Sequence, residues 1–168
     1  MLSFVENYSY HMQTICIPFN KLSLDQLYAI MRLRQEVFVV EQKCAYLDAD
    51  GLDQKSLHLL AYLGDELVGY SRLVPRGLSY ENYPSIGRVL SSQRVRGKRL
   101  GKPLVEASVQ ALLENFGKQT IKISAQAHLV KFYNNCGFQI TGEEYLEDGI
   151  PHIGMLRVVE GVEGVEGG

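Results

Sequence analysis

The sequence predicts an α/β (α+β) fold, in which a mixed central sheet of about seven strands is flanked by helices on both faces. Seven short runs rich in apolar and β-branched residues are separated by turn residues. Longer segments with apolar side chains at helical spacing lie between these runs rather than after them. The length of 168 residues, with 46% hydrophobic and 21% charged residues, fits one globular domain.

The N-terminal part is predicted to contain one strand and the first helix. The strand covers residues 14–19. Ser23 and Gln26 form a capping-box pattern, in which each side chain can bond the backbone N–H of the other residue. Apolar residues follow at helical spacing, so we expect this helix to run to about Val40. Residues 41–56 are polar and acidic, which favours an irregular loop or a short second helix.

Three strands are expected in the middle of the chain. The runs 57–63 and 67–74 flank a turn at residues 64–66 and therefore predict a hairpin. Residues 75–84 contain two prolines and a glycine, which is typical of a loop. A further strand is predicted over residues 85–90.

The C-terminal half alternates between helices and strands. A helix over residues 100–116 keeps an apolar face, and Gly117 is a plausible C-cap. The elements predicted after it are a strand over 120–125, a helix over 127–136, a strand over 138–145 and a last strand over 152–159. The complete order is therefore β-α-(α)-β-β-β-α-β-α-β-β.

The chain is expected to form a single domain over residues 1–159, with residues 1–12 as a mobile lead-in. Residues 160–168 form an acidic, low-complexity tail that is too poor in apolar residues to pack alone. No signal-peptide pattern and no apolar run of about 18 residues is present, so we expect a cytoplasmic protein without a membrane span. The three cysteines are widely spaced, which predicts neither a metal site nor a disulfide framework.

A basic loop at residues 94–102 is the most distinctive segment. It carries five positive charges in nine residues, whereas the whole chain has a net charge of only -2. Glycines in the loop allow close approach of the backbone to an anion, and the N-terminus of the following helix favours negative charge. The loop therefore predicts a site for phosphate groups. Because the basic charge is confined to this short loop, we do not expect a nucleic-acid partner.

Two nucleotide-binding motifs do not fit this loop. A Walker A loop places four residues between its glycines and a serine or threonine after its lysine, but three residues separate Gly97 from Gly101 and Pro103 follows Lys102. A dinucleotide-binding G-x-G-x-x-G pattern is absent as well. The remaining prediction is a phosphate ligand that does not need a protein-bound metal.

The loop resembles the [QR]-x-x-G-x-[GA] signature of the GCN5-related N-acetyltransferase (GNAT) family. The segment 96–101 matches this signature, except that Arg99 stands in place of the middle glycine. A second block of the family, N-x-x-A-x-x-x-Y-x-x-x-G-F, is similar to residues 126–138. Gln126 replaces the asparagine and Leu129 the alanine, whereas Tyr133 and the final Gly-Phe pair are intact.

Longer segments resemble the ElaA-like branch of the same family. They are distributed between about residue 22 and residue 157 and lie at 33–42, 86–89, 125–129 and 147–155. The resemblance implies a GNAT fold and binding of acetyl-CoA in a V-shaped gap between the fourth and fifth strands.

The resemblance also implies roles for particular residues. Backbone groups of the fourth strand would hold the pantetheine arm and bond the thioester oxygen. The basic loop would bind the pyrophosphate, and Tyr133 would protonate the departing CoA sulfur. The cofactor-binding residues implied in this way are Val89, Leu90, Ser91, Arg94, Arg96, Gly97, Lys98, Arg99, Leu100, Gly101, Gln126 and Tyr133.

The first candidates for the general base are acidic residues that we expect to border the acceptor. These residues are Glu36, Glu41, Asp48, Asp50 and Asp53, and their charges would attract a protonated amine. Glu41 is the first candidate for the base, although a solvated acidic loop explains the same pattern. Arg88 lies on the strand beside the gap. It is expected either to pair with a carboxylate such as Glu36 or Glu41, or to hold an acidic acceptor.

Histidines offer a second candidate base. His152 enters the last strand, where it can face the acceptor, and an imidazole is a suitable base near neutral pH. His128, at the start of the helix that carries Tyr133, is a further possibility. His58 lies within a strand and is expected to be a core residue with its hydrogen bonds satisfied.

The predicted function is N-acetyl transfer from acetyl-CoA to a primary amine of a small molecule or peptide, by direct attack. A covalent intermediate on Cys44 or Cys136 is the second mechanism considered. The alternative function is a non-catalytic, CoA-binding regulatory module, and nucleic-acid binding by the basic loop is a distant third. We expect a monomer or a homodimer.

Overall fold

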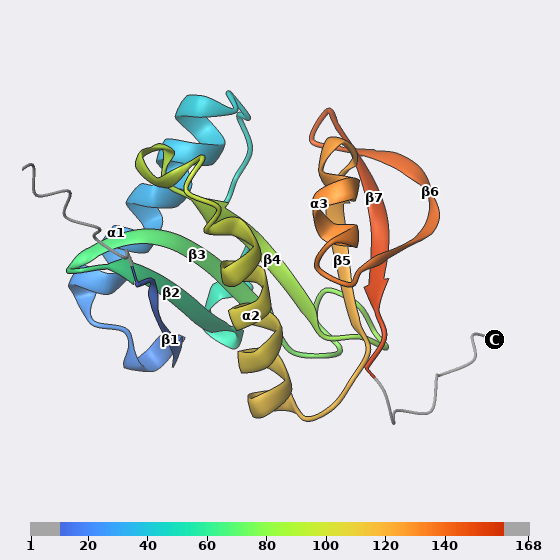
Figure 1. Cartoon of the computed structure of the whole chain (residues 1–168), viewed down its shortest axis with the longest axis horizontal. Coiled ribbons are helices and arrows are strands. Elements are labelled where there is room, and N and C mark those ends of the chain that lie inside the picture. The colour runs from blue at the N-terminus through green and yellow to red at the C-terminus, as the bar shows by residue number, and fades with distance from the viewer. Residues whose placement is uncertain (1–10, 160–168) are drawn as a thin grey trace, which may run out of the picture.

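A computed structural model describes residues 11–159, so most of the predicted lead-in and the predicted tail lie outside the described residues. Its centre is a seven-stranded mixed sheet with the strand order β1-β2-β3-β4-β5-β7-β6 (Figure 1). The strands are β1 (Gln13–Pro18), β2 (Leu57–Leu63), β3 (Glu66–Val74), β4 (Ser85–Ser91), β5 (Ile121–Gln126), β6 (Gln139–Glu147) and β7 (Ile150–Arg157). The α-helices are α1 (Leu24–Arg34), α2 (Gly101–Phe116) and α3 (Val130–Asn134). The predicted fold class and element order are confirmed.

Helix α1 begins with the predicted capping box. The Ser23 hydroxyl accepts a hydrogen bond from the Gln26 backbone N–H at 3.1 Å, and the Gln26 side chain accepts one from the Ser23 N–H at 2.9 Å. After Arg34 the chain continues as a π-helical segment, Gln35–Glu41. The helical region therefore has the predicted length, but its last part is wound more widely, as is common near functional sites.

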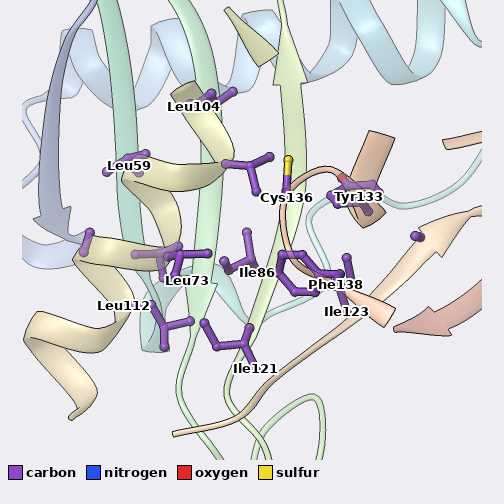
Figure 2. Close-up of a cluster of buried hydrophobic side chains, with 14 of the residues drawn as sticks. Leu59, Leu73, Ile86, Leu104, Leu112, Ile121, Ile123, Tyr133, Cys136 and Phe138 are labelled. Carbon is purple, nitrogen blue, oxygen red and sulfur yellow. The ribbon is translucent and has the colours of Figure 1, made fainter. Parts of the chain in front are cut away.

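Two hydrophobic clusters cover the two faces of the sheet, because β2 and β3 are buried on both sides. Leu59 and Ala61 of β2 pack in the cluster beneath α2 and α3, whereas Leu60 between them packs against α1. Figure 1 shows α2 and α3 on one side of the sheet and α1 on the other. Figure 2 shows the larger cluster, in which α2 contributes Leu104 and Leu112.

The C-terminal elements differ from the prediction only at their ends. The expected helix over 127–136 is divided into a 3-10 turn, Ala127–Leu129, and the short helix α3. Strand β6 extends to Glu147, because the turn that follows needs only two residues. Asp148 and Gly149 have φ values of 49° and 77°, and they reverse the chain directly into β7.

Strands β4 and β5 form the single parallel junction of the sheet, and they separate soon after they meet. One residue pair, Ser85 with Lys122, is in register, and it lies where both strands begin. Beyond it, the edge of β4 that faces β5 has no strand partner. This divergence is the predicted V-shaped gap between the fourth and fifth strands (Figure 1). Among residues 11–159, no helix is both long and apolar enough to cross a membrane.

Candidate active site

A cavity of about 550 Å³ opens where β4 and β5 diverge. Its walls come from β4, β5, α3, the turn between β6 and β7, and residues 42–56, which lie beyond the π-helical segment and are called here the irregular segment that follows α1. Val89, Gln126, Tyr133 and His152 all line this cavity. The structure therefore brings together residues that were predicted from three separate parts of the sequence.

Tyr133 is buried to about nine-tenths, with only 9% of its surface exposed. Its ring meets Phe132 and Phe138 edge to face, with centroids 5.1 and 5.9 Å away. Figure 2 labels Tyr133 and Phe138 in the larger hydrophobic cluster. Within residues 11–159 its hydroxyl has no hydrogen-bond partner, and the residue lines the cavity. Burial, assisted by the nearby Cys136 thiol, raises the pKa of Tyr133 to about 12. The phenol is thus protonated at neutral pH and free to donate its proton to a ligand.

His152 and Gln126 face each other in the β5–β7 pairing. The His152 Nδ1 lies 2.8 Å from the carbonyl oxygen of Ile150. A carbonyl can only accept, so Nδ1 donates the hydrogen bond and Nε2 is the atom that can accept a proton. The ring stacks on Tyr145 with a centroid separation of 6.3 Å. Gln126 bonds the side chain of Gln42 weakly, at 3.4 Å, across the cavity.

The basic loop adopts a compact conformation just before α2. Gly97 has a φ of 80°, in the left-handed region that glycine adopts without strain. Arg99 also lies there, with a φ of 58°, at the position where the family signature has glycine. A residue with a side chain costs about 1–2 kcal/mol more in this conformation. The loop leads through Leu100 into Gly101, the first residue of α2, where unpaired N–H groups of a helix terminus are expected.

Two cations of the basic loop already have carboxylate partners. Arg94 pairs with Glu66, and Arg96 forms a two-bond pair with Glu41 in which the second bond is 2.8 Å long. The Arg96 guanidinium also donates to the carbonyl oxygen of Ser91 at 3.2 Å. Lys98 is tied into the loop through its backbone N–H, which bonds Val95 at 3.1 Å. The side of the loop nearest the π-helical segment is therefore partly neutralised.

The environment of Glu41 gives no support to its predicted role as the general base. The hydrogen bonds from Arg96 lower the pKa of the Glu41 carboxyl, which weakens it as a base. The residue faces the basic loop and is not among those that line the cavity. Its role in catalysis stays an untested prediction, and the structure instead assigns it a position beside the expected phosphate site.

A buried network of arginines and aspartates borders the cavity, and sequence reasoning did not find it. Arg34 on α1 is fully buried and bonds Asp48 at 2.6 Å and Asp53 at 2.8 Å. Arg72 on β3 bonds Asp50 at 2.7 Å and Asp53 at 2.9 Å. Burial raises the pKa of Asp50, but the hydrogen bond from Arg72 and the charges of Arg72 and Arg88 outweigh it and lower the pKa to about 2. The network fastens the irregular segment that follows α1 to the sheet.

Arg88 completes this network, which confirms the expected ion pair with a carboxylate but with other partners than Glu36 or Glu41. It bonds Asp48 at 2.6 Å and Asp50 at 3.3 Å, not the glutamates near the end of α1. Its backbone has a φ of 53°, at an irregularity in the β3–β4 pairing that turns the guanidinium toward the segment after α1. The ring of Tyr46 lies 5.6 Å from its guanidinium carbon.

The predicted acidic region is therefore not a free negative surface. Asp48, Asp50 and Asp53 are all paired with arginines, so the expectation that they attract the amine is wrong. The sequence contained one signal for this arrangement, because Arg34 falls within the apolar pattern of α1. A buried arginine requires carboxylate partners, and the polar segment that follows α1 could have supplied them.

The remaining candidates are distributed as follows. His58 is a satisfied core residue, as predicted, with bonds to the Tyr70 hydroxyl at 2.8 Å and the Asp53 carbonyl at 3.0 Å. His128 is exposed and does not line the cavity. Cys44 lines the cavity, whereas Cys136 is buried in the larger hydrophobic cluster.

The divergent strands, the glycine-containing basic loop before α2 and the cavity tyrosine agree with the arrangement that the resemblance to the GNAT family implies. Residues 24–158 match the family model described as an acetyltransferase (GNAT) domain, and the chain belongs to this family.

The chain is similar to ElaA proteins in both sequence and structure. Protein ElaA of Escherichia coli K12 is 42% identical over 142 residues, which cover 83% of this chain and 92% of ElaA. The crystal structure of Escherichia coli ElaA has a TM-score of 0.81 at 38% identity and covers 88% of this chain and 99% of that chain. The crystal structure of an acyl-CoA N-acyltransferase from Pseudomonas aeruginosa has a TM-score of 0.81 at 43% identity. The match covers 88% of this chain and 100% of that chain. The predicted resemblance to the ElaA-like branch is confirmed.

Proposed function

We propose that this protein is an N-acetyltransferase that transfers an acetyl group from acetyl-CoA to a primary amine by direct attack. The observation that carries the proposal is the Tyr133 hydroxyl, which is protonated and unpartnered within residues 11–159 and belongs to a residue that lines the cavity between β4 and β5. A structural tyrosine in a hydrophobic cluster would normally satisfy its hydroxyl within the protein or in bulk water.

The chain offers binding groups for each part of acetyl-CoA. The unpaired edge of β4 at Val89 and Leu90 provides backbone groups for the pantetheine amides and one N–H for the thioester oxygen. Leu90 is itself buried against α1, so its backbone rather than its side chain faces the gap. Gly97 and the N-terminus of α2 provide backbone N–H groups for the pyrophosphate.

His152 is proposed as the general base, acting directly or through water. Its Nε2 is the free acceptor, and the residue lines the same cavity as Tyr133. The base removes a proton from the acceptor ammonium, and the amine nitrogen then bonds the acetyl carbon while the carbon–sulfur bond breaks. Tyr133 donates its proton to the leaving thiolate and recovers one from the attacking nitrogen through solvent. One proton is released overall for each ammonium acetylated.

Thiol release from acetyl-CoA, measured across a panel of amines, tests this proposal. Amine-dependent thiol release, together with the matching acetylated product by mass spectrometry, is the expected result. Tight CoA binding without turnover of any amine would instead support a non-catalytic CoA-binding module.

Replacing Gly97 with aspartate is expected to weaken CoA binding by about tenfold or more. The substitution places a side chain on a left-handed residue and a negative charge beside the expected phosphate site. Isothermal titration of CoA into the purified variant measures the effect. Gly77→Asp, at a left-handed glycine with a φ of 89° in the loop between β3 and β4, is the matched control. Equal affinity of the two variants would place the pyrophosphate elsewhere.

A further inference from the structure

The charged groups around the cavity divide into a paired set and an unpaired set. Arg72, Arg88 and Asp50 line the cavity, and both guanidinium groups bond the Asp50 carboxylate. The complete network contains three arginines and three aspartates, so its charges cancel. Glu147 and Asp148, at the turn between β6 and β7, also line the cavity and have no ion pair within residues 11–159. The uncompensated charge of the cavity is therefore negative.

Glu147 is held in a defined position over β5. The Ser124 hydroxyl donates a hydrogen bond to Glu147 Oε2 at 2.7 Å. Because that hydroxyl has one proton, its second contact, with the Tyr145 hydroxyl, must be donated by the tyrosine. Ser124 projects on the side of β5 opposite to the buried Ile123, and Gln126 follows two residues later on the same side. The carboxylate thus lies on the wall that also carries Gln126.

Lys122 forms no ion pair with this carboxylate within residues 11–159. Lys122 is on the same side of β5, but its Nζ lies over the rings of Tyr80 and Tyr83, at 4.8 and 5.9 Å from their centroids. Tyr80 lines the cavity, and its pKa is raised to about 12 by burial and by the charges of Tyr145 and Glu147. A carboxylate beside aromatic rings is a favourable environment for an organic cation.

The part of the cavity wall formed by Tyr133 has a different character. Tyr133 is nine-tenths buried, and its unpartnered hydroxyl is the group expected to meet the thioester sulfur. Gln126 and His152 face each other across β5 and β7 and line the same cavity as Tyr133 and Glu147. A ligand that spans the cavity would therefore place an uncharged, reacting group near Tyr133 and a cationic group near Glu147.

We propose that the acceptor is a short alkyl diamine or polyamine whose second ammonium group binds Glu147. The proposal rests on the proposed acetyltransferase function and specifies its substrate class. An alkyl ammonium has a pKa near that of lysine, about 10, so the second amine is charged at neutral pH and pairs with the carboxylate. A cavity of about 550 Å³ is in the range for small molecules and suits such an acceptor rather than a folded protein. Transfer forms one amide at the first nitrogen and leaves the second ammonium unchanged.

The test compares 1,4-diaminobutane with butylamine, which has the same chain but no second ammonium group. The wild-type protein is expected to show a kcat/KM about tenfold higher for the diamine, the size expected for one hydrogen bond to a charged group. Glu147→Gln is expected to remove most of this ratio. Glu144→Gln is the matched control, because Glu144 lies on the same strand, is exposed and does not line the cavity. It should preserve the ratio.

The outcomes separate this proposal from the function on which it rests. Equal kcat/KM for the two amines, or a ratio that survives in Glu147→Gln, would overturn the diamine assignment while the acetyltransferase function stands. A lysine peptide acetylated with a higher kcat/KM than the diamine would also overturn it. Absence of thiol release with every amine would remove the acetyltransferase function itself, and the diamine assignment with it.

Discussion

Tyr133→Phe is expected to lower kcat for acetyl transfer by about 10- to 1000-fold, because the change removes the proposed proton donor to the CoA thiolate. Affinity for acetyl-CoA should change little, since the ring remains packed against Phe132 and Phe138. Folding stability should also be retained within about 0.5 kcal/mol, because the hydroxyl makes no hydrogen bond in the described part of the chain. Steady-state thiol release and thermal unfolding measure the two quantities separately.

The control for this prediction is Tyr62→Phe. Tyr62 is half-buried on β2, packs against the α1 cluster and lies outside the cavity, so its hydroxyl has no role in the proposed transfer. Wild-type kcat in Tyr133→Phe would show that the leaving thiolate obtains its proton elsewhere. A loss of kcat of similar size in both variants would show that the effect is not specific to the cavity.

Arg34→Met is expected to reduce the free energy of unfolding by about 3–5 kcal/mol. The arginine is fully buried, and its removal leaves Asp48 with Arg88 alone and Asp53 with Arg72 alone, so three aspartates share two arginines. Removing one member of a buried ion-pair network leaves buried charge uncompensated, which is the costly case. Methionine keeps much of the side-chain volume, so the expected loss is electrostatic rather than a cavity effect. Urea denaturation measures the change.

Two further variants make the stability prediction decisive. Arg32→Met alters an exposed arginine on the same helix, whose pair with Glu36 is a surface pair, and should change stability by less than about 1 kcal/mol. Arg34→Lys keeps the positive charge but cannot bond two carboxylates with one planar fork, so it should lie between Arg34→Met and the wild type. If Arg34→Met were as stable as Arg32→Met, the network would not be what holds the segment after α1 in place.

The network also holds one wall of the cavity in position. Its aspartates lie in the irregular segment after α1, which supplies Cys44, Tyr46 and Leu47 to the wall of the cavity. This segment has little regular structure of its own, apart from a 3-10 turn at Asp53–Lys55. Its position therefore depends on bonds to arginines of α1, β3 and β4. This wall of the cavity is built on buried ion pairs rather than on a second helix.

The sequence by itself determined the fold class and the order of the elements, and it located the loop that we expect to bind the cofactor phosphates. These features depend on local patterns: the capping box at Ser23 and Gln26, the apolar periodicity of the helices, and the spacing of Gly97 and Tyr133 in family motifs. Local patterns are readable because they arise from backbone geometry within a few residues. The burial of His58 was predictable as well, because the residue lies within an apolar strand pattern.

The partners of the charged residues were decided only by the tertiary structure. Arg34 bonds aspartates 14 and 19 residues away, Arg88 bonds one 40 residues away, and Arg96 reaches Glu41 across 55 residues. Such pairs depend on how α1, β3 and β4 pack, and on the divergence of β4 from β5, which no local pattern encodes. A sequence shows how many charges a chain carries, but only packing decides which of them are neutralised in the interior. That is why the paired aspartates were mistaken for a free acidic surface, and why the unpaired Glu147 became visible only in the folded protein.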